Sequence, residues 1–163
     1  MQIWVEIREP AQGITEEEAR DLAARVLREL GMEGAELSLL LVDDREMARL
    51  NLQFLGRDGT TNVMAFSQLE GEGPPPSSHK LLGDVVICLD TCGRESRDAG
   101  ISFHQRFLEL LVHGVLHLLG HEHEADRHGA ALMALEERRV LEAMGLDGGP
   151  GKKREPGSYT GGG

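Results

Sequence analysis

The sequence predicts a single domain of the α+β class, in which a mixed sheet of about four strands is packed by helices. Three observations lead to this prediction. Apolar segments of strand length occur in the first part of the chain, whereas the two longest helical patterns come last. A chain of 163 residues, 40% of them hydrophobic, is long enough to enclose one core. No internal repeat points to a solenoid.

The first part of the chain alternates between strand and helix patterns. Residues 2–8 alternate apolar and polar side chains, as expected of a half-buried strand. Thr15 and Glu18 have the spacing of a capping box that begins a helix, and Gly31 ends the apolar stripe that follows. A second strand is predicted at 37–42.

The middle of the chain supplies another helix and two more strands. Asp43 or Asp44 is expected to cap a helix that carries apolar side chains toward the core. Residues 60–67 have the pattern of a third strand, and residues 81–89, the most apolar segment, are expected to be a central strand. Between them, residues 71–78 are rich in Gly, Pro and Ser, which is typical of a loop.

Helices are predicted for most of the remaining chain, at about 90–99, 102–119 and 125–144. The pattern over 102–119 is apolar on nearly all sides, which is typical of a buried helix. Residues 147–163 are rich in Gly, Lys and Pro and are expected to form a disordered tail. The single domain then spans residues 1–146.

The composition restricts the partners and the compartment. A net charge of −11 argues against broad electrostatic attraction to nucleic acid. No apolar stretch has the length of a membrane span, and the N-terminus lacks a signal-like pattern, so we expect a cytoplasmic protein. Cys88 and Cys92 are then expected to be free thiols. A local basic groove remains an alternative, because arginines gather in mid-sequence at Arg45, Arg49, Arg57, Arg94, Arg97 and Arg106.

Four of the seven histidines fall between positions 113 and 123. His113 and His117 are one helical turn apart and share a face. Gly120 can adopt the left-handed conformation that ends a helix, so the chain can turn back and bring His123 to the same ion. The spacing H-x3-H-x5-H therefore predicts a zinc site on the buried helix and the turn after it. His121 is a weaker alternative for the third ligand, because it follows the glycine directly.

Three protein ligands leave a fourth position open for water, which is typical of catalytic rather than structural zinc. The same histidine spacing occurs in zinc proteases, where a glutamate after the first histidine is the general base. Here that position is Gly114, which has no side chain to accept a proton, so peptide hydrolysis by that route is disfavoured. Glu122 is a conceivable substitute base on the turn.

The histidine motif and several further segments resemble those of the YbeY endoribonuclease family of bacterial ribosomal RNA maturation factors. The resemblance covers about residues 35–145. Its segments are Leu50-Asn51, Thr61-Asn62-Val63-Met64-Ala65-Phe66, Leu82-Gly83-Asp84-Val85-Val86-Ile87 and the histidine motif, and the later Met133 and Glu136 also fit.

The resemblance implies a single-strand-specific, metal-dependent endoribonuclease that hydrolyses RNA phosphodiester bonds. Its expected role is 3′-end maturation of small-subunit ribosomal RNA and ribosome quality control. The ligands carried over are His113, His117 and His123, holding one Zn²⁺ per chain, although imidazole also suits other divalent transition metals. The expected partners are single-stranded RNA, ribosomal RNA and the small ribosomal subunit, with no membrane and no DNA.

The sequence departs from the family pattern near the predicted catalytic residues. Leu55 stands where the family usually has an arginine after the aromatic Phe54. Arg57 is therefore the candidate to orient the RNA phosphate, and Glu122 is the candidate acid. Water at the fourth metal position is the expected nucleophile, and the ribose 2′-OH is the alternative.

Three other polar residues could each have a functional or a purely structural role. Thr61 and Asn62 either contact the RNA backbone or satisfy their own strand turn. Asp84 either holds a ligand imidazole or caps the entry of a strand.

Two other classes of function stay open. The first is a zinc hydrolase of another kind, such as a protease or an amidase, against which Gly114 counts. The second is a ribosome-associated RNA-binding factor with a structural zinc and weak or no nuclease activity. Leu55 and the acidic net charge are the arguments for it.

Overall fold

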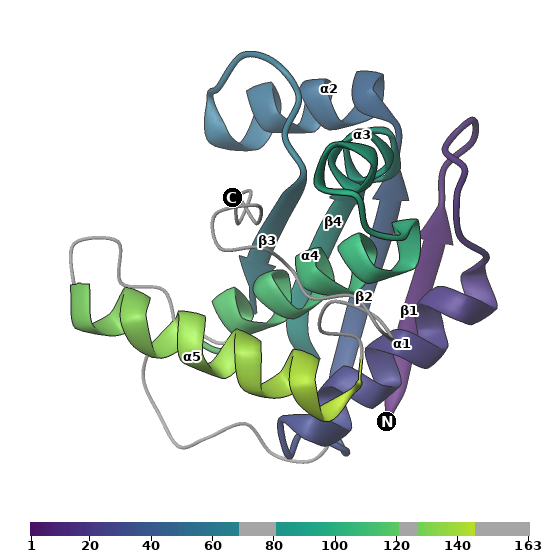
Figure 1. Cartoon of the computed structure of the whole chain (residues 1–163). Helices are drawn as coiled ribbons and strands as arrows, with labels where there is room; N and C mark the ends of the chain where they lie inside the picture. Colours follow the sequence, from purple (N-terminus) through teal and green to yellow (C-terminus); the bar gives the residue numbers. More distant parts are fainter. Residues whose placement is uncertain (69–80, 121–126, 146–163) are drawn as a thin grey trace.

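The computed structural model describes residues 1–68, 81–120 and 127–145. Its sheet has the order β1-β2-β4-β3, with β1, β2 and β4 parallel and β3 antiparallel to β4 (Figure 1). The predicted mixed sheet of four strands is therefore confirmed, and the most apolar strand is an inner one. The elements are β1 (Gln2–Ile7), α1 (Glu16–Glu29), β2 (Glu36–Val42), α2 (Asp44–Leu55), β3 (Val63–Ser67), β4 (Leu81–Cys88), α3 (Leu89–Ala99), α4 (Phe103–Leu118) and α5 (Arg127–Ala143).

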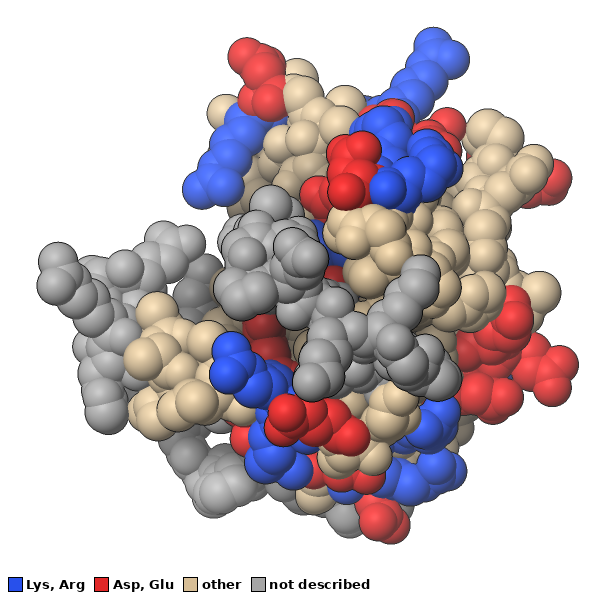
Figure 2. All heavy atoms as spheres, in the orientation of Figure 1, with Lys and Arg blue, Asp and Glu red and all other residues tan. Residues whose placement is uncertain are grey.

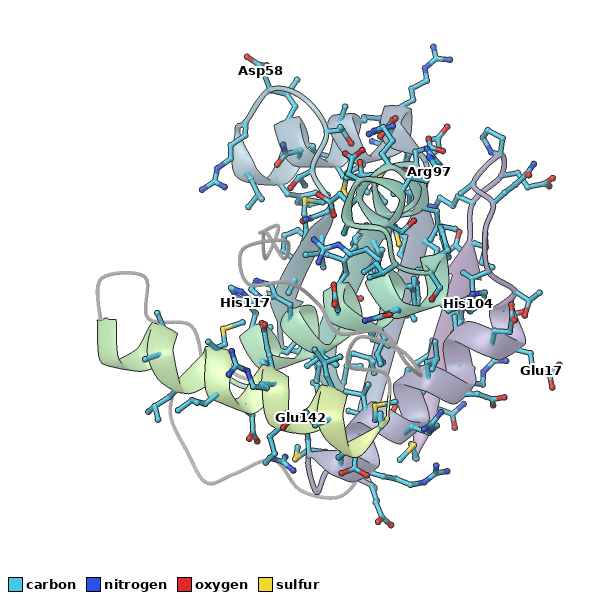
Figure 3. The ribbon with its side chains drawn as sticks, in the orientation of Figure 1. Glu17, Asp58, Arg97, His104, His117 and Glu142 are labelled. Atoms are coloured by element: carbon cyan, nitrogen blue, oxygen red, sulfur yellow. The ribbon has the colours of Figure 1, made fainter. Side chains whose placement is uncertain are left out.

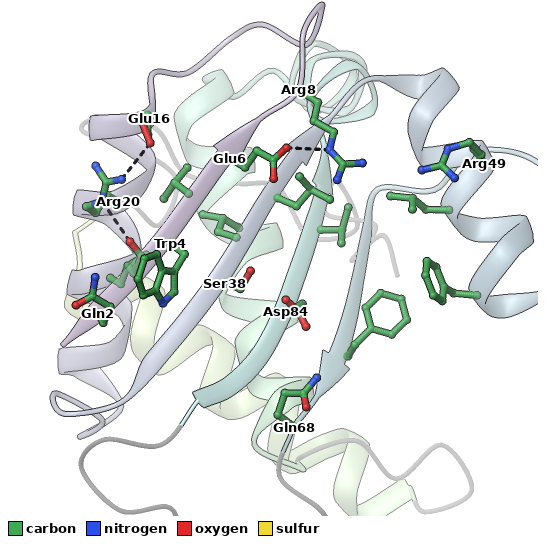
Figure 4. A pocket seen from close by; sticks show the side chains of 18 of the residues that line it. Gln2, Trp4, Glu6, Arg8, Glu16, Arg20, Ser38, Arg49, Gln68 and Asp84 are labelled. Carbon is green, nitrogen blue, oxygen red and sulfur yellow. Dashed lines mark hydrogen bonds and ion pairs between the residues drawn. The ribbon is translucent and has the colours of Figure 1, made fainter.

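The helices are divided unequally between the two faces of the sheet. Helices α1 and α4 pack against one face, and α5 lies along α4 (Figure 1). Helix α2 covers one end of the opposite face, where Met47 and Leu50 join a smaller apolar cluster with Val86. The described helices leave the rest of that face uncovered, where it forms a groove of about 1050 Å³ (Figure 4).

Local signals begin and end these helices as the sequence predicts. The Thr15 side chain accepts a hydrogen bond from the Glu18 backbone N–H, and the Glu18 carboxylate accepts one from the Thr15 N–H. Asp43, rather than Asp44, is the N-cap of α2. Gly31 lies just beyond α1 with φ +71°, which is the left-handed conformation that favours glycine.

Two glycines allow α4 to lie close to the sheet. A Cβ added at Gly114 would come within 2.8 Å of the Val85 side chain on β4. A Cβ at Gly83, which has φ +147°, would come within 2.2 Å of the Phe66 carbonyl oxygen on β3. At the same place the Ser67 hydroxyl donates a hydrogen bond to the Leu118 carbonyl at 3.2 Å. The close approach fixes the end of α4 that carries the histidines against β3 and β4.

Helix α4 is buried, as predicted, but it is not wholly apolar. The Arg106 side chain is 3% exposed and donates to Glu109 at 2.9 Å and to Glu95 of α3 at 2.8 Å. Burial alone would lower the pKa of Arg106, but its hydrogen bonds to Glu109 and Glu95 raise it above the usual value. This buried cluster of Arg106, Glu109 and Glu95 joins α3 to α4, and the sequence analysis did not predict it.

No helix among the described residues combines the length and the apolar character needed to cross a bilayer. The tail predicted at 147–163 lies outside the described residues.

Candidate metal centre

Two histidines of α4 point toward one place. The Nε2 atoms of His113 and His117 lie 2.9 Å apart, and their ring centroids are separated by 4.4 Å. Both side chains project from the last turns of the helix, beside α5, where Figure 3 labels His117. The predicted shared face of these two residues is confirmed.

The turn after α4 begins as expected. Leu119 is the C-cap, and Gly120 follows with φ +81°, the left-handed conformation on which the metal prediction depends. The residues that should complete the site, His123 and Glu122, and the alternative ligand His121 lie outside the described residues. The assignment of these three residues therefore stays a prediction.

The residues present fit a divalent transition metal. Two nitrogen ligands at about 2.0–2.1 Å from a tetrahedral zinc ion lie roughly 3.3 Å from each other. The separation of 2.9 Å between the Nε2 atoms of His113 and His117 is close to this value. Among the described residues no group of three or more His, Cys, Asp or Glu side chains is placed to hold an ion. The third ligand that the histidine spacing predicts, His123, falls outside the residues searched.

A carboxylate from α5 completes the surroundings of the first histidine. The Nδ1 atom of His113 is hydrogen-bonded to Glu137 Oε1, and the two side chains are 16% and 11% exposed. Sequence reasoning missed Glu137 and noted its neighbour Glu136, which instead pairs with Arg139 at 2.7 Å. A signal was present, because Glu137 interrupts the buried stripe of α5 formed by Met133, Val140, Leu141 and Met144.

Arg57, the candidate to orient the RNA phosphate, is not brought next to the histidines. Its side chain is exposed after α2, and the described residues show no hydrogen bond or ion pair from it to His113 or His117. Figure 3 labels its sequence neighbour Asp58 well away from His117. The catalytic role of Arg57 stays a prediction.

Asn62 and Asp84 occupy structural rather than metal-facing positions. Asn62 is 4% exposed, and its side-chain amide donates to the Glu95 carboxylate of α3 at 3.3 Å. Asp84 lies within β4 and lines the uncovered face of the sheet, whereas the next residue, Val85, faces α4. Asp84 makes no hydrogen bond to His113 or His117, the two motif histidines that the structure describes, and it lies inside β4 rather than at the strand entry.

Three of the six mid-sequence arginines are already paired with carboxylates. Arg49 pairs with Glu46, Arg94 pairs with Asp44, and Arg106 is buried between two carboxylates. On the face drawn in Figure 2, basic and acidic side chains of the described residues are interleaved over the helices.

The two cysteines are free and buried, as predicted, and they lie apart from the histidine pair. Burial raises the pKa of Cys92 to about 12, and burial also raises the pKa of Cys88. Burial therefore favours the protonated, unreactive form of both thiols at neutral pH.

The fold and the histidine pair together define a class: small α+β proteins with two histidines one turn apart on a buried helix. The particular family follows from comparison with known sequences. The family model described as Endoribonuclease YbeY matches residues 5–145, and the chain belongs to this family.

Individual relatives agree with this assignment. An Endoribonuclease YbeY from Syntrophotalea carbinolica is 45% identical over 124 residues, which cover 75% of this chain and 81% of the relative. One from Geobacter metallireducens is 34% identical over 149 residues, which cover 91% and 99%. A solution structure from Thermotoga maritima has a TM-score of 0.62 and 23% identity, covering 88% of this chain and 90% of that one. This last comparison establishes similarity of fold.

Proposed function

We propose that this chain is a metal-dependent endoribonuclease that cleaves single-stranded RNA, with 3′-end maturation of small-subunit ribosomal RNA as its role. Membership of an endoribonuclease family gives the class of reaction, a hydrolase acting on RNA. The observation that carries the metal dependence is the convergence of the His113 and His117 Nε2 atoms, 2.9 Å apart.

The chain's own residues prepare a site for one Zn²⁺ ion. Nε2 of His113 and Nε2 of His117 are the ligating atoms, and His123 is the predicted third ligand. Glu137 is hydrogen-bonded to Nδ1 of His113, the ring nitrogen opposite the Nε2 atom that faces His117. A bound divalent ion would lower the pKa of a coordinated water and polarise a phosphoryl oxygen of the RNA.

The surroundings of Gly114 count against the protease alternative. A Cβ at this position would point at Val85 and Val63 of the sheet, with contacts of 2.8 and 3.3 Å. A larger side chain at this position would therefore clash with the sheet unless α4 moved. No general base of the zinc-protease kind is available at position 114.

The proposal places the protein in the cytoplasm, acting on the RNA of the small ribosomal subunit. Two buried, unpaired thiols are in keeping with a reducing compartment. A cytoplasmic ribonuclease meets ribosomal RNA precursors directly.

A cleavage assay with a histidine variant tests the proposal. The parent protein, loaded with Zn²⁺, is expected to cut a single-stranded RNA oligonucleotide and to leave the same sequence intact in a duplex. His117→Ala should lose activity by more than about 100-fold, since even outer partners of metal ligands cost 10–100-fold when removed.

His104→Ala is the matched control, because His104 is an exposed histidine at the other end of α4 that pairs with Glu18. This variant should cleave as the parent does. Equal cleavage by the parent and His117→Ala would refute the catalytic metal site. If the metal-loaded parent did not cleave at all, the structural-zinc alternative would be favoured.

A further inference from the structure

Helix α5 carries one carboxylate on the side that faces the core. Its buried positions are Met133, Glu137, Val140 and Leu141, which follow helical spacing. Glu137 is 9% exposed, although glutamate is rarely this buried unless it is paired. A partner is therefore required, and the packing of α5 along α4 supplies it.

That partner is the first histidine of the metal motif. Glu137 Oε1 on α5 and His113 Nδ1 on α4 form a hydrogen bond, although the two residues are 24 positions apart in the sequence. A carboxylate oxygen is an acceptor, so the geometry assigns the hydrogen of this bond to Nδ1. The lone pair of the His113 ring then lies on Nε2, the atom that faces His117 at 2.9 Å.

We infer that Glu137 is a positioning residue that holds His113 in the tautomer and orientation needed to bind the metal. This inference rests on the proposed metal-dependent function and deepens it. The carboxylate fixes the ring by its hydrogen bond, and its negative charge makes the opposite nitrogen a stronger donor to a cation. The docking of α5 through Met133 and Val140 therefore contributes directly to metal affinity.

The chain contains a matched control at the adjacent position. Glu136 belongs to the same helix, is 29% exposed, and pairs with Arg139 within α5. Glu136→Gln removes one negative charge from the same helix but leaves the His113 contact intact. A difference between the two positions therefore reports the contact rather than the net charge.

The first measurement is the Zn²⁺ dissociation constant, obtained by competition with a chromophoric chelator. Glu137→Ala should weaken Zn²⁺ binding by about 10–100-fold. Glu137→Gln keeps the shape and an acceptor oxygen but loses the charge, so about 3–10-fold is expected. Glu136→Gln should stay within about twofold of the parent.

The second measurement needs no metal. Nitrogen-15 NMR of the histidine rings in the metal-free protein should place the His113 hydrogen on Nδ1 in the parent and in Glu136→Gln. In Glu137→Ala the hydrogen should move to Nε2, the position that predominates in free histidine. A role in packing alone would change unfolding temperature without changing the tautomer.

Equal Zn²⁺ affinities in the parent and both Glu137 variants would overturn the inference. So would an equal loss in Glu136→Gln, or a parent His113 hydrogen on Nε2. If Glu137→Ala fails to fold, Glu137→Gln carries the test. A parent that binds no Zn²⁺ would refute the proposed function as well. If His117→Ala abolishes binding while the Glu137 variants bind normally, only the positioning role is lost.

Discussion

Gly114 matters both for the packing of α4 against the sheet and for the chemistry next to His113. It stands directly after His113, the first predicted metal ligand, and its missing side chain lets α4 approach Val85 and Val63. Gly114→Ala should lower the free energy of unfolding by about 1–3 kcal/mol through overpacking, reduced by the roughly 0.5–1 kcal/mol that alanine gains in a helix. Urea unfolding at neutral pH measures the change.

Gly93→Ala is the control for that experiment. Gly93 also lies in a helix, α3, but its added Cβ would meet nothing closer than the flexible end of Arg97 at 3.4 Å. This variant should be as stable as the parent or slightly more stable. If Gly114→Ala were equally well tolerated, α4 would not be held close to the sheet as described.

Glu46 links single-residue electrostatics to the pH dependence of stability. Hydrogen bonds from Arg49 lower its pKa from 4.5 to about 2, aided by Arg8 and opposed by partial burial. Because the folded pKa is lowered, the unfolded state binds more protons at acid pH. The stabilisation is present above about pH 4.5 and is lost as the pH falls toward about 2.

Glu46→Gln should therefore be less stable than the parent at pH 6, and the difference should shrink below about pH 4.5 and vanish as the pH falls to about 2. Urea midpoints measured at several pH values test this. Glu142→Gln is the control, since Glu142 is exposed on α5 and its side chain makes no ion pair among the described residues. A constant difference between Glu46→Gln and the parent at all pH values would contradict the linkage.

At the scale of elements, Arg106 shows what sequence patterns leave out. The order of strands and helices is local information, carried by apolar periodicity, by the Thr15 cap and by Gly31 and Gly120. The ion cluster is tertiary information, because Glu95 reaches Arg106 from another helix. Glu137 was missed for the same reason: its partner His113 lies on α4, and only the packing of α5 brings the two together.

The Arg106 cluster makes its own prediction. Arg106→Leu leaves the carboxylate of Glu109, 1% exposed, buried without its arginine. The expected loss is about 3–5 kcal/mol in the free energy of unfolding. The double variant Arg106→Leu/Glu109→Leu should recover much of this loss, because it removes the buried charge together with its partner. A double variant as unstable as the single one would show that the arginine stabilises α4 by other contacts.

At the scale of the whole molecule, the two faces of the sheet differ in how far the described helices cover them. The histidines lie with α4 and α5 on the covered face, whereas Asp84 and Trp4 lie on the uncovered one (Figure 4). Trp4 is 55% exposed there because it points to the opposite side of β1 from the buried Ile3. The alternation over 2–8 tells which residues share a face, whereas the crossover connections decide which helices cover that face.

Charge over the whole molecule predicts how RNA is bound. The net charge is −11, and arginines such as Arg8, Arg49 and Arg94 are already paired with carboxylates. Few side chains are then left to neutralise RNA phosphates. Each phosphate contact on a single strand adds only about −0.7 to the slope of log RNA affinity against log salt concentration. The cleavage-deficient His117→Ala should bind single-stranded RNA with a slope shallower than about −2, measured by fluorescence anisotropy at 50–300 mM salt.

A slope steeper than about −4 would mean that six or more phosphates are contacted, and a strongly basic surface would then have to exist beyond the described residues.

Arg57→Gln gives the internal reference for this measurement. If the exposed Arg57 guanidinium contacts one phosphate, as the sequence predicts, its loss should reduce the slope by about 0.7 without changing the fold. An unchanged slope in Arg57→Gln would remove Arg57 from the RNA path and leave recognition to the metal centre and to contacts independent of charge.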